Sequence, residues 1–374
     1  MKVLYLLRFD AESKGGGDVI QIRKYAEFVR GCGGEASFTS SLTPDATGHD
    51  LIHACNIDRP ETYFQIMHVA RTFPGTPIIL TPIHHSNAQR REYERHGRRG
   101  VLRLVNLLCP SYQFREALKF LFRGLRNRAL LPPSLRFLTV PRPQQKIAAK
   151  ASLALLASQS EQKWCDEDYQ IRFARPEIFP NGFQKGGTVS DTAVRDIDVI
   201  MTGRIESRKN QVSVLKALAG SKLKVRLVGA LNQSHQGYLA ELNALLAANP
   251  TFEHLGARPH PETLSLLNRA RLYISASWLE VMSLSDLEAF AAGCKVVASK
   301  HGSTHEVLGD RVRYVNPASI EEIRTVLMEE LGKPPPSATP DSNRLIDSYQ
   351  WENFGATLVE IYRREISGKP SAGI

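Results

Sequence analysis

The chain has 374 residues, which is long for one ordinary hydrophobic core and suits two α/β domains of roughly 150–200 residues each. Its composition, with 42% hydrophobic and 23% charged residues and no low-complexity tract, excludes a disordered protein. The net charge is +10, and essentially all of this excess lies in residues 90–146, which hold 14 Lys and Arg against 3 Glu. Such clustering predicts one basic surface and not a uniformly basic protein.

Neither the cysteines nor the apolar runs indicate a secreted or membrane-spanning protein. The five cysteines are odd in number and lack metal-ligand spacing, so we expect reduced thiols in a cytosolic protein. The apolar run before Arg8 is too short for a signal peptide, and no stretch approaches the ~18 apolar residues that span a bilayer. We therefore expect a cytoplasmic protein that is soluble or lies on the inner face of the cytoplasmic membrane without crossing it.

Short apolar runs alternate with helical patterns along both halves of the chain, which is typical of parallel βα units. The predicted strands span residues 3–7, 36–39, 51–54, 78–81, 153–157 and 177–179 in the first half, and 198–202, 224–228, 271–275, 295–298 and 313–315 in the second. The clearest helical patterns cover residues 18–30, 210–218, 238–247, 261–269 and 320–331. The sequence thus predicts an α/β protein with two Rossmann-like domains.

A polar, aperiodic stretch at residues 185–195 separates the two halves, and we place the domain boundary there. The first domain would cover residues 1–185 and the second residues 196–350. A proline-rich break at residues 333–340 precedes a last helical pattern, around residues 351–366. We expect residues 351–374 to form a C-terminal helix that packs back towards the first domain.

Two features of the first half follow predicted strands. The run Lys14-Gly15-Gly16-Gly17-Asp18 follows the first predicted strand and opens a helix, and taken alone it suits a flexible turn. His84 and His85 come after the strand at residues 78–81, where a histidine can donate a hydrogen bond to a ligand. The sequence does not decide which of the two histidines would face a ligand.

The basic segment, residues 90–146, contains an amphipathic pattern. Apolar residues recur there at helical spacing with cations between them: Phe114, Leu118, Leu121 and Leu125 alternate with Arg115, Lys119, Arg123, Arg126 and Arg128. This pattern suits an anionic membrane surface, to which each well-placed cation contributes about 1 kcal/mol. The alternatives are a helix that packs its apolar side on the domain with a solvated basic face, and nucleic-acid binding, for which stacking aromatics are sparse.

The second half carries cations at the end of its first strand, in the segment 198–210 (DVIMTGRIESRKN). Gly203 permits a close backbone approach, and Arg204 and Lys209 could reach a diphosphate from the strand end and the next helix start. Two surface cations beside a loop are the alternative. Because both cations follow the first strand of the second half, a binding role is favoured over a chance arrangement.

A second segment, residues 277–293 (SWLEVMSLSDLEAFAAG), follows a predicted buried strand. It offers free backbone N–H groups and a helix N-terminus beside the carboxyl end of that strand, where phosphates are stabilised. Glu280 and Glu288 flank this position, and carboxylates there suit hydroxyl-rich groups. Alternatively, Ser285 and Glu288 form a capping box and Glu280 is a solvated surface residue.

The second half resembles the donor domain of retaining family 4 glycosyltransferases, which have the GT-B fold. The Gly-Arg-(x)4-Lys-Asn segment of that family is matched by Gly203-Arg204 and Lys209-Asn210, and its Glu-(x)7-Glu signature by Glu280 and Glu288. Lesser matches follow in the expected order at residues 180–182, 227–229, 255–256, 306–307 and 348–354. The resemblance covers most of residues 150–365, and it implies two Rossmann-like domains facing each other across a cleft.

The resemblance also implies roles for individual residues. Arg204 and Lys209 would neutralise the donor diphosphate, Glu288 would hold the ribose, and Glu280 would hold the transferred sugar. Further donor contacts are implied near Gly16, Gly17, Gly203, Ala257, Arg258, Met282, Ser283 and Leu284, and a catalytic contact for His84 or His85. Val281-Met282-Ser283 stands where the family has glycine–aromatic–glycine, and these bulkier residues would narrow the space around the sugar.

We therefore predict a retaining hexosyltransferase-like enzyme that moves a sugar from a UDP- or GDP-linked donor to an acceptor hydroxyl. A lipid-linked glycan or a cell-surface polysaccharide precursor is the expected acceptor. The family implies no metal and no cofactor besides the donor, and His301 and His305, although spaced as His-x3-His, lack a carboxylate motif. The alternatives are a non-catalytic membrane- or nucleic-acid-binding protein, and another GT-B enzyme such as a sugar-nucleotide epimerase.

Overall fold

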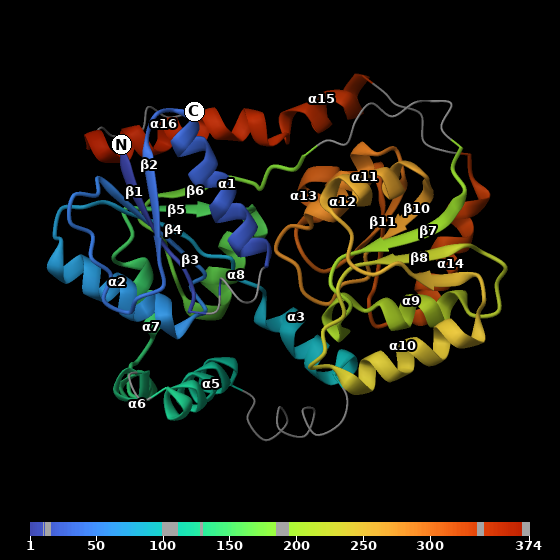
Figure 1. The fold of residues 1–374 in the computed structure, drawn as a ribbon, viewed down its shortest axis with the longest axis horizontal. Coiled ribbons are helices and arrows are strands. Elements are labelled where there is room, and N and C mark those ends of the chain that lie inside the picture. The colour runs from blue at the N-terminus through green and yellow to red at the C-terminus, as the bar shows by residue number, and fades with distance from the viewer. Residues whose placement is uncertain are drawn as a thin grey trace. The chain divides into compact units, whose positions relative to one another are not determined.

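The computed structural model describes residues 1–9, 11, 16–98, 111–127, 130–184, 194–334 and 340–368 (Figure 1). The chain divides into two compact units, each with its own sheet and core. Unit 1 comprises Met1–Asn87, Leu107–Asn181 and Glu352–Ile374, and unit 2 comprises Ala88–Asn106 and Gly182–Trp351. Each unit is therefore assembled from separate stretches of the chain.

Unit 1 is built on a six-stranded parallel sheet in the order β2-β1-β3-β4-β5-β6. Its strands are β1 (Lys2–Leu6), β2 (Glu35–Thr39), β3 (Leu51–Cys55), β4 (Ile78–Thr81), β5 (Leu153–Leu156) and β6 (Pro176–Ile178). Every residue of β3, β4 and β5 is buried, as expected of parallel strands that are covered by helices on both faces.

The helices of unit 1 are α1 (Gly17–Gly31), α2 (Pro60–Thr72), α5 (Tyr112–Arg126), α6 (Leu131–Leu138), α7 (Pro143–Ala148), α8 (Gln159–Tyr169) and most of α16 (Trp351–Ser367). Ser158 caps the start of α8, and Glu161 holds the residue before it. The Ser158 hydroxyl accepts a hydrogen bond from the Glu161 N–H at 3.0 Å, and the Glu161 carboxylate accepts one from the Ala157 N–H at 2.7 Å.

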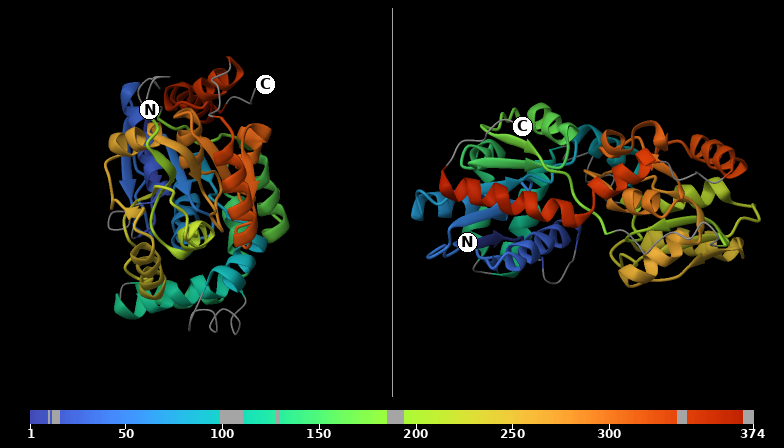
Figure 2. Two further views of the ribbon diagram at one scale, coloured as in Figure 1. Left: turned by 90° about the vertical axis from the view of Figure 1, so that its right-hand side faces the viewer. Right: turned by 90° about the horizontal axis from the view of Figure 1, so that it is seen from above.

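The C-terminal helix α16 packs on unit 1, far in sequence from the strands that it contacts (Figure 2). The Tyr362 hydroxyl bonds the buried His53 ring, and the carboxylate of Glu365 pairs with Arg175 at 2.8 Å. Burial lowers the pKa of His53 to about 3, so this histidine is neutral in the folded chain.

Unit 2 contains a second six-stranded parallel sheet, in the order β12-β11-β10-β7-β8-β9. Its strands are β7 (Ile197–Thr202), β8 (Val225–Val228), β9 (Phe252–His254), β10 (Ala270–Ile274), β11 (Lys295–Ser299) and β12 (Arg313–Val315). Buried aliphatic residues of the central strands and of the flanking helices form its core, among them Val199, Leu227, Leu272 and Val297.

The helices of unit 2 surround this sheet. They are α3 (Asn87–Glu92), the π-helix η1 (Tyr93–Gly97), the 3-10 helices η3 (Ser207–Lys209) and η4 (Gly309–Arg311), α9 (Gln211–Leu218), α10 (Gln236–Ala248), α11 (His260–Asn268), α12 (Leu284–Ala291), α13 (Thr304–Leu308), α14 (Ile320–Gly332) and α15 (Pro340–Ser348). The first two come from the N-terminal half of the sequence and yet cluster with unit 2, apart from Asn87 itself.

The predicted α/β architecture with two parallel sheets is confirmed, and all eleven predicted strands form. The twelfth strand, β9, is not predicted by the sequence because its three residues, Phe-Glu-His, carry too little apolar pattern. Most of the predicted boundary at residues 185–195 lies outside the described residues. Among the described helices, we find none that is long and apolar enough to cross a membrane.

Candidate donor site

The sheet of unit 2 has a switch point between its neighbouring strands β7 and β10. From β7 the chain continues outward through β8 to β9, and from β10 it continues in the other direction through β11 to β12. Loops that leave the carboxyl ends of two such strands diverge, and open α/β sheets bind ligands in the crevice between them. Arg204 and Lys209 follow β7, and Glu280 follows β10, so the topology brings both predicted segments to this place.

Two glycines shape the turn after β7. Gly203 has a φ of +118°, a conformation that side chains rarely adopt, and its N–H donates to the Val228 carbonyl at 2.9 Å. A Cβ on Gly229, whose φ is +152°, would overlap the Gly203 carbonyl oxygen. The loops after β7 and β8 therefore meet backbone to backbone, and Arg204 leaves this turn with an exposed side chain.

Lys209 and Glu280 are in direct contact, although they lie 71 residues apart in the sequence. Their ammonium and carboxylate form an ion pair, with the side chains 19% and 12% exposed. The backbone joins the same two segments, since the Trp278 N–H donates to the Arg208 carbonyl at 2.9 Å. The alternative that Glu280 is a solvated surface residue is wrong.

A second ion pair lies beside the first. Arg208 bonds the Glu206 carboxylate at 3.1 Å, and the Asn232 amide donates to the same carboxylate at 2.8 Å. Burial acts to lower the pKa of Arg208, but the carboxylates of Glu280 and Glu206 raise it. Burial acts to raise the pKa of Glu206, and Arg208 and Asn232 together lower it. Both groups therefore stay charged at neutral pH.

The loop that carries Glu280 is held by the turn after β11. Gly302, with a φ of +89°, lies so close that a Cβ there would come within 2.9 Å of the Glu280 Cβ. The Ser303 N–H donates to the Val281 carbonyl at 2.9 Å, and the Ser303 hydroxyl donates to the same oxygen. The backbone position of Glu280 is therefore fixed from two sides.

Helix α12 starts two residues earlier than the proposed capping box requires. It begins at Leu284, with Ser283 at the N-cap, so Ser285 lies inside the helix and cannot cap it, and the capping-box alternative is wrong. The Ser283 hydroxyl instead donates to Asp286 at 2.7 Å, and Thr304 donates to the same carboxylate at 2.9 Å. Burial raises the pKa of Asp286 to about 6.

Glu288 projects from α12 towards the start of α11. One of its carboxylate oxygens lies 2.8 Å from the His260 Nε2. Ala257 and Arg258 precede this histidine in the loop after β9, and both are exposed. The structure thus brings Glu288 near the loop of Ala257 and Arg258, where donor contacts are expected, and it adds His260, which no sequence motif indicates.

Residues 281–283, which replace the family's glycine–aromatic–glycine, turn their side chains into the protein. Val281 and Met282 are both buried, with 8% and 7% of their surface exposed, and Ser283 is engaged with Asp286. The bulk of these side chains therefore packs against protein. Their backbone remains the part that a ligand could contact.

In unit 1, the predicted glycine loop is described only from Gly16 onward, since Lys14 and Gly15 lie outside the described residues. Gly16 is the N-cap of α1, and a Cβ there would lie 3.3 Å from a guanidinium nitrogen of Arg8. Arg8 pairs with Asp18 at 2.8 Å. A Cβ on Gly17 would meet nothing within 4 Å, so the start of α1 is crowded on one side and open on the other.

The two predicted histidines have different environments. His84 is fully buried; its Nδ1 faces the Asp58 carboxylate at 3.1 Å, and its Nε2 lies 2.9 Å from Asp168. Its ring is therefore committed within unit 1 and is not available for a ligand. His85 is only partly buried. Of the two histidines, His85 is the one with an accessible surface, and its catalytic role stays a prediction.

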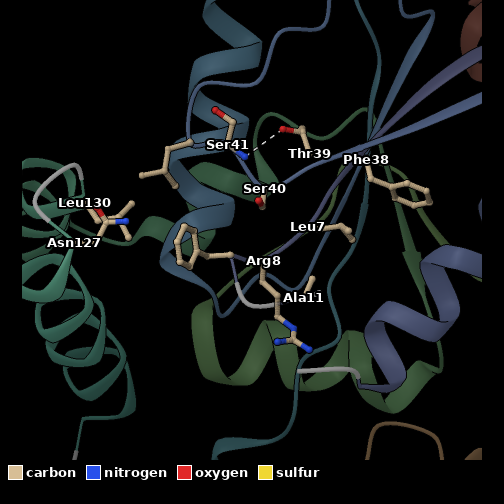
Figure 3. Close-up of a pocket in the computed structure, with 11 residues that line it drawn as sticks. Leu7, Arg8, Ala11, Phe38, Thr39, Ser40, Ser41, Asn127 and Leu130 are labelled. Atoms are coloured by element: carbon tan, nitrogen blue, oxygen red, sulfur yellow. Dashed lines mark hydrogen bonds between the residues drawn. The ribbon is translucent and has the colours of Figure 1, made fainter. Parts of the chain in front are cut away.

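A cavity of about 580 Å³ opens at the carboxyl ends of β1 and β2 (Figure 3). Its lining combines apolar side chains with hydroxyl and amide groups: Leu7, Arg8, Phe9, Ala11, Phe38, Thr39, Ser40, Ser41, Leu42, Asn127 and Leu130. Because Arg8 is paired with Asp18, the cavity presents little net charge. Its volume lies within the range of about 300–1,000 Å³ that is typical of small-molecule sites.

The described residues contain no cluster of three or more His, Cys, Asp or Glu that could hold a metal ion. His301, considered above for its spacing, lies between the Trp278 carbonyl at 2.9 Å and the Glu92 carboxylate at 3.0 Å. His301 therefore links α3 to the loop after β10 within unit 2.

Known proteins with similar sequences are glycosyltransferases. Residues 189–336 match the family model of glycosyl transferases group 1. Within the chain, 112 residues are 31% identical to the MMP α-(1→4)-mannosyltransferase of Mycolicibacterium hassiacum, covering 28% of this chain and 27% of that protein. A longer stretch of 176 residues is 24% identical to one subunit of the phosphatidylinositol N-acetylglucosaminyltransferase of Arabidopsis thaliana, covering 46% and 39%. The matched stretches thus span less than half of either relative.

The fold of the whole chain also has solved counterparts. Anabaena Alr3699/HepE, solved in complex with UDP, superposes with a TM-score of 0.65 over 97% of this chain and 100% of that one, at 18% identity. The same protein has been solved with UDP-glucose. Residues 189–336 are therefore similar to the glycosyl transferases group 1 family, and the chain that carries them has the GT-B fold.

Proposed function

We propose that this protein is a glycosyltransferase that uses a nucleoside diphosphate sugar as donor. The observation that supports this best is the contact between Lys209 and Glu280 at the switch point of the second sheet. A cation and a carboxylate side by side suit a ligand that carries a diphosphate next to hydroxyl groups. The binding of UDP and UDP-glucose by Anabaena Alr3699/HepE, which shares the fold, adds support for such a donor.

In this proposal the ion pair exchanges partners when the donor binds. The diphosphate takes Lys209 and Arg204, and Glu280 turns its carboxylate to the hydroxyls of the sugar. Glu288, now bonded to His260, would accept hydrogen bonds from the ribose. The pairing between Arg208 and Glu206 can persist, because neither group is needed for the donor.

The reaction that we propose proceeds with retention and without a metal. The bond between the anomeric carbon and the diphosphate oxygen breaks, and a bond from that carbon to the acceptor oxygen forms on the same face. The acceptor proton passes to the leaving diphosphate. Lys209 and Arg204 would stabilise the negative charge that grows on the diphosphate, so catalysis rests on positioning and electrostatics.

For the acceptor we propose an amphiphile held by unit 1. The 580 Å³ cavity offers apolar and hydroxyl-bearing walls and little net charge, which suits a neutral glycan or the neck of a lipid-linked one. His85 is the histidine that we place against the donor sugar. The name of the Arabidopsis relative includes a phosphatidylinositol acceptor, which adds support for a lipid-linked class.

We further propose that α5 and α6 attach the protein to an anionic membrane surface. Their inner face packs on α2, where Phe120 and Phe137 meet Phe64, and Arg123 pairs with Glu61 at 2.6 Å. Their outer face leaves five large apolar side chains exposed: Phe114, Phe122, Leu125, Leu135 and Leu138. Exposed apolar groups among cations favour an interfacial membrane site over a solvated basic face.

Binding of nucleoside diphosphates tests the proposal most directly. The melting temperature should rise with one of UDP, GDP or ADP, and the corresponding nucleotide should be released from its sugar donor faster when acceptor is present. An epimerase would release nucleotide, or invert the sugar, without an acceptor. A membrane- or nucleic-acid-binding module would respond to none of the three nucleotides, and that result would reject the proposed function.

A further inference from the structure

Residues 88–98, which we call the strap, belong to unit 2 although the chain enters them from β4 of unit 1. The strap contains most of α3 and the five-residue π-helix η1. π-Helical turns are rare and occur frequently at functional sites. The strap lies against the two segments that carry Lys209 and Glu280.

On one side the strap contacts the start of η3. The hydroxyl of the buried Tyr93 lies 2.6 Å from the Ser207 hydroxyl, two residues before Lys209. The Ser207 N–H in turn points to the His235 ring at 3.4 Å. The guanidinium of Arg98 covers the Tyr93 ring at 5.4 Å. The tyrosine is therefore held in place, and its hydroxyl fixes the turn that leads to Lys209.

On the other side the strap contacts Trp278, two residues before Glu280. The His96 ring stacks on the indole with an interplanar angle of 11° and 6.3 Å between centroids. A Cβ on Gly97 would come within 2.8 Å of the indole nitrogen, so the end of η1 packs on Trp278 as closely as glycine allows. The strap also reaches the Trp278 carbonyl through Glu92 and His301.

We propose that the strap is a positioning element of the donor site, with Tyr93 as its main positioning residue. It fixes the segments of Lys209 and Glu280 at the spacing that the diphosphate and the sugar require. This inference rests on the proposed function, but it concerns residues that would not touch the donor. Loosening the strap should therefore weaken donor binding more than it slows the chemical step.

The substitution Tyr93→Phe removes one hydroxyl and leaves the ring against Trp278. We expect the dissociation constant for UDP or GDP, measured by calorimetry with whichever nucleotide the wild-type chain binds, to rise about three- to tenfold, the effect of one lost hydrogen bond. The KM for the donor should rise by the same factor while kcat changes less. Ser207→Ala should raise the dissociation constant by the same factor, whereas Ser207→Thr, which keeps a hydroxyl, should retain the wild-type affinity. The double variant Tyr93→Phe with Ser207→Ala should bind the nucleotide no more weakly than either single variant, because both substitutions remove the same hydrogen bond.

A matched pair of glycine substitutions tests the other side of the strap. Gly97→Ala introduces a Cβ against both the Tyr93 ring and Trp278, and it should weaken nucleotide binding and alter the tryptophan fluorescence. Gly237→Ala, on the exposed start of α10, meets nothing within 4 Å and should leave both unchanged. Near-UV circular dichroism identifies any variant that fails to fold.

The outcomes separate the two proposals. Wild-type affinity in folded Tyr93→Phe and Gly97→Ala would overturn the positioning role and leave the donor site intact. An equal loss of kcat with unchanged affinity would also overturn it. A wild-type chain that binds none of UDP, GDP and ADP would reject the proposed function itself.

Discussion

The Lys209 ammonium is already neutralised by Glu280 in the structure, so a donor must compete for it. A diphosphate carries more charge than one carboxylate and accepts hydrogen bonds on several oxygens, which favours the exchange. Glu280 then loses its cation and gains sugar hydroxyls. The roles of Lys209 and Glu280 are therefore coupled, because each is the ion-pair partner of the other until the donor binds.

Replacing Lys209 with alanine tests this exchange. We expect turnover to fall about 10²- to 10³-fold, the usual cost of removing one group that stabilises developing charge. The chain should still fold, because the arginine at position 208 also faces Glu280 and limits the cost of the unpaired carboxylate. Steady-state release of nucleotide from the donor measures the effect.

Lys216→Ala is the matched control for this substitution. Lys216 lies on α9, a little further along the chain, and is likewise paired with a glutamate, Glu241, but outside the site. Its loss should leave turnover within about twofold of the wild-type value, since a partly exposed ion pair outside the site contributes little. Comparable rates in Lys209→Ala and Lys216→Ala would remove Lys209 from the mechanism.

Asp286 predicts a pH dependence of stability. Because burial raises its pKa to about 6 from a usual 3.8, the folded chain keeps a proton that the unfolded chain loses. Stability should therefore fall as pH rises through this window, by on the order of 3 kcal/mol. Asp286→Asn removes the titration, so the wild-type chain should lose stability relative to the variant between about pH 4 and 6.

Urea denaturation of both chains from pH 4 to 7 measures this difference. Asp310→Asn, which alters an exposed carboxylate of the same unit, serves as the control. The difference between wild type and Asp286→Asn should grow with pH, and that between wild type and Asp310→Asn should not. A constant offset in both comparisons would contradict the role of burial.

At this scale the sequence predicted the site's charged residues but not their partners. The motifs pointed to Arg204, Lys209, Glu280 and Glu288 because cations and carboxylates at those spacings follow strand ends. His260 and Asp286 were missed, since a single histidine or an aspartate in a helix has no pattern of its own. Their roles come from tertiary contacts with Glu288 and with Ser283.

At the scale of elements, α5 joins an inner packing face to an exposed apolar outer face. Phe122 and Leu125 are 65% and 59% exposed, and Lys119 and Arg126 are exposed on the same helix. Insertion of such a face into the headgroup region removes apolar area from water while the cations meet anionic lipid. We therefore expect the wild-type chain to co-sediment with phosphatidylglycerol-containing vesicles at low salt and much less with phosphatidylcholine vesicles.

Phe122→Ser combined with Leu125→Ser should release most of the protein from these vesicles. The control is Ile20→Ser on α1, which removes an apolar side chain of similar exposure from another helix of unit 1. It should leave binding unchanged. Failure of the wild-type chain to co-sediment, or equal release by Ile20→Ser, would rule out this surface.

Elements were predictable where the pattern was local. Buried parallel strands such as β3 and β4 show as apolar runs, and α16 shows as a final helical pattern. The strap could not be predicted, because its polar sequence gives no sign that Tyr93 and Gly97 meet Trp278, which lies about 180 residues further on. Contacts of this kind depend on topology and not on periodicity.

At the scale of the whole molecule, the two units are interleaved in sequence. The strap inserts unit 2 residues into the first half of the chain, and α16 returns to unit 1 after unit 2 is complete. Unit 1 therefore cannot finish its core until the last helix has been made. This arrangement makes the stability of unit 1 depend on residues more than 170 positions after its last strand.

Deleting residues 352–374 tests that dependence. The deletion removes four nearly inaccessible side chains from unit 1, those of Leu358, Val359, Ile361 and Tyr362. At about 1.5–3 kcal/mol each, their burial is comparable with the roughly 5–15 kcal/mol by which a domain is stable. We expect the shortened chain to lose the cooperative unfolding of unit 1, followed through Trp164, and to keep that of unit 2, followed through nucleotide binding.

A chain that ends at Gly368 retains all of α16 and controls for shortening. An unchanged unit 1 transition in the chain without α16 would show that the helix is dispensable, and that the contacts of Tyr362 with His53 and of Glu365 with Arg175 contribute little.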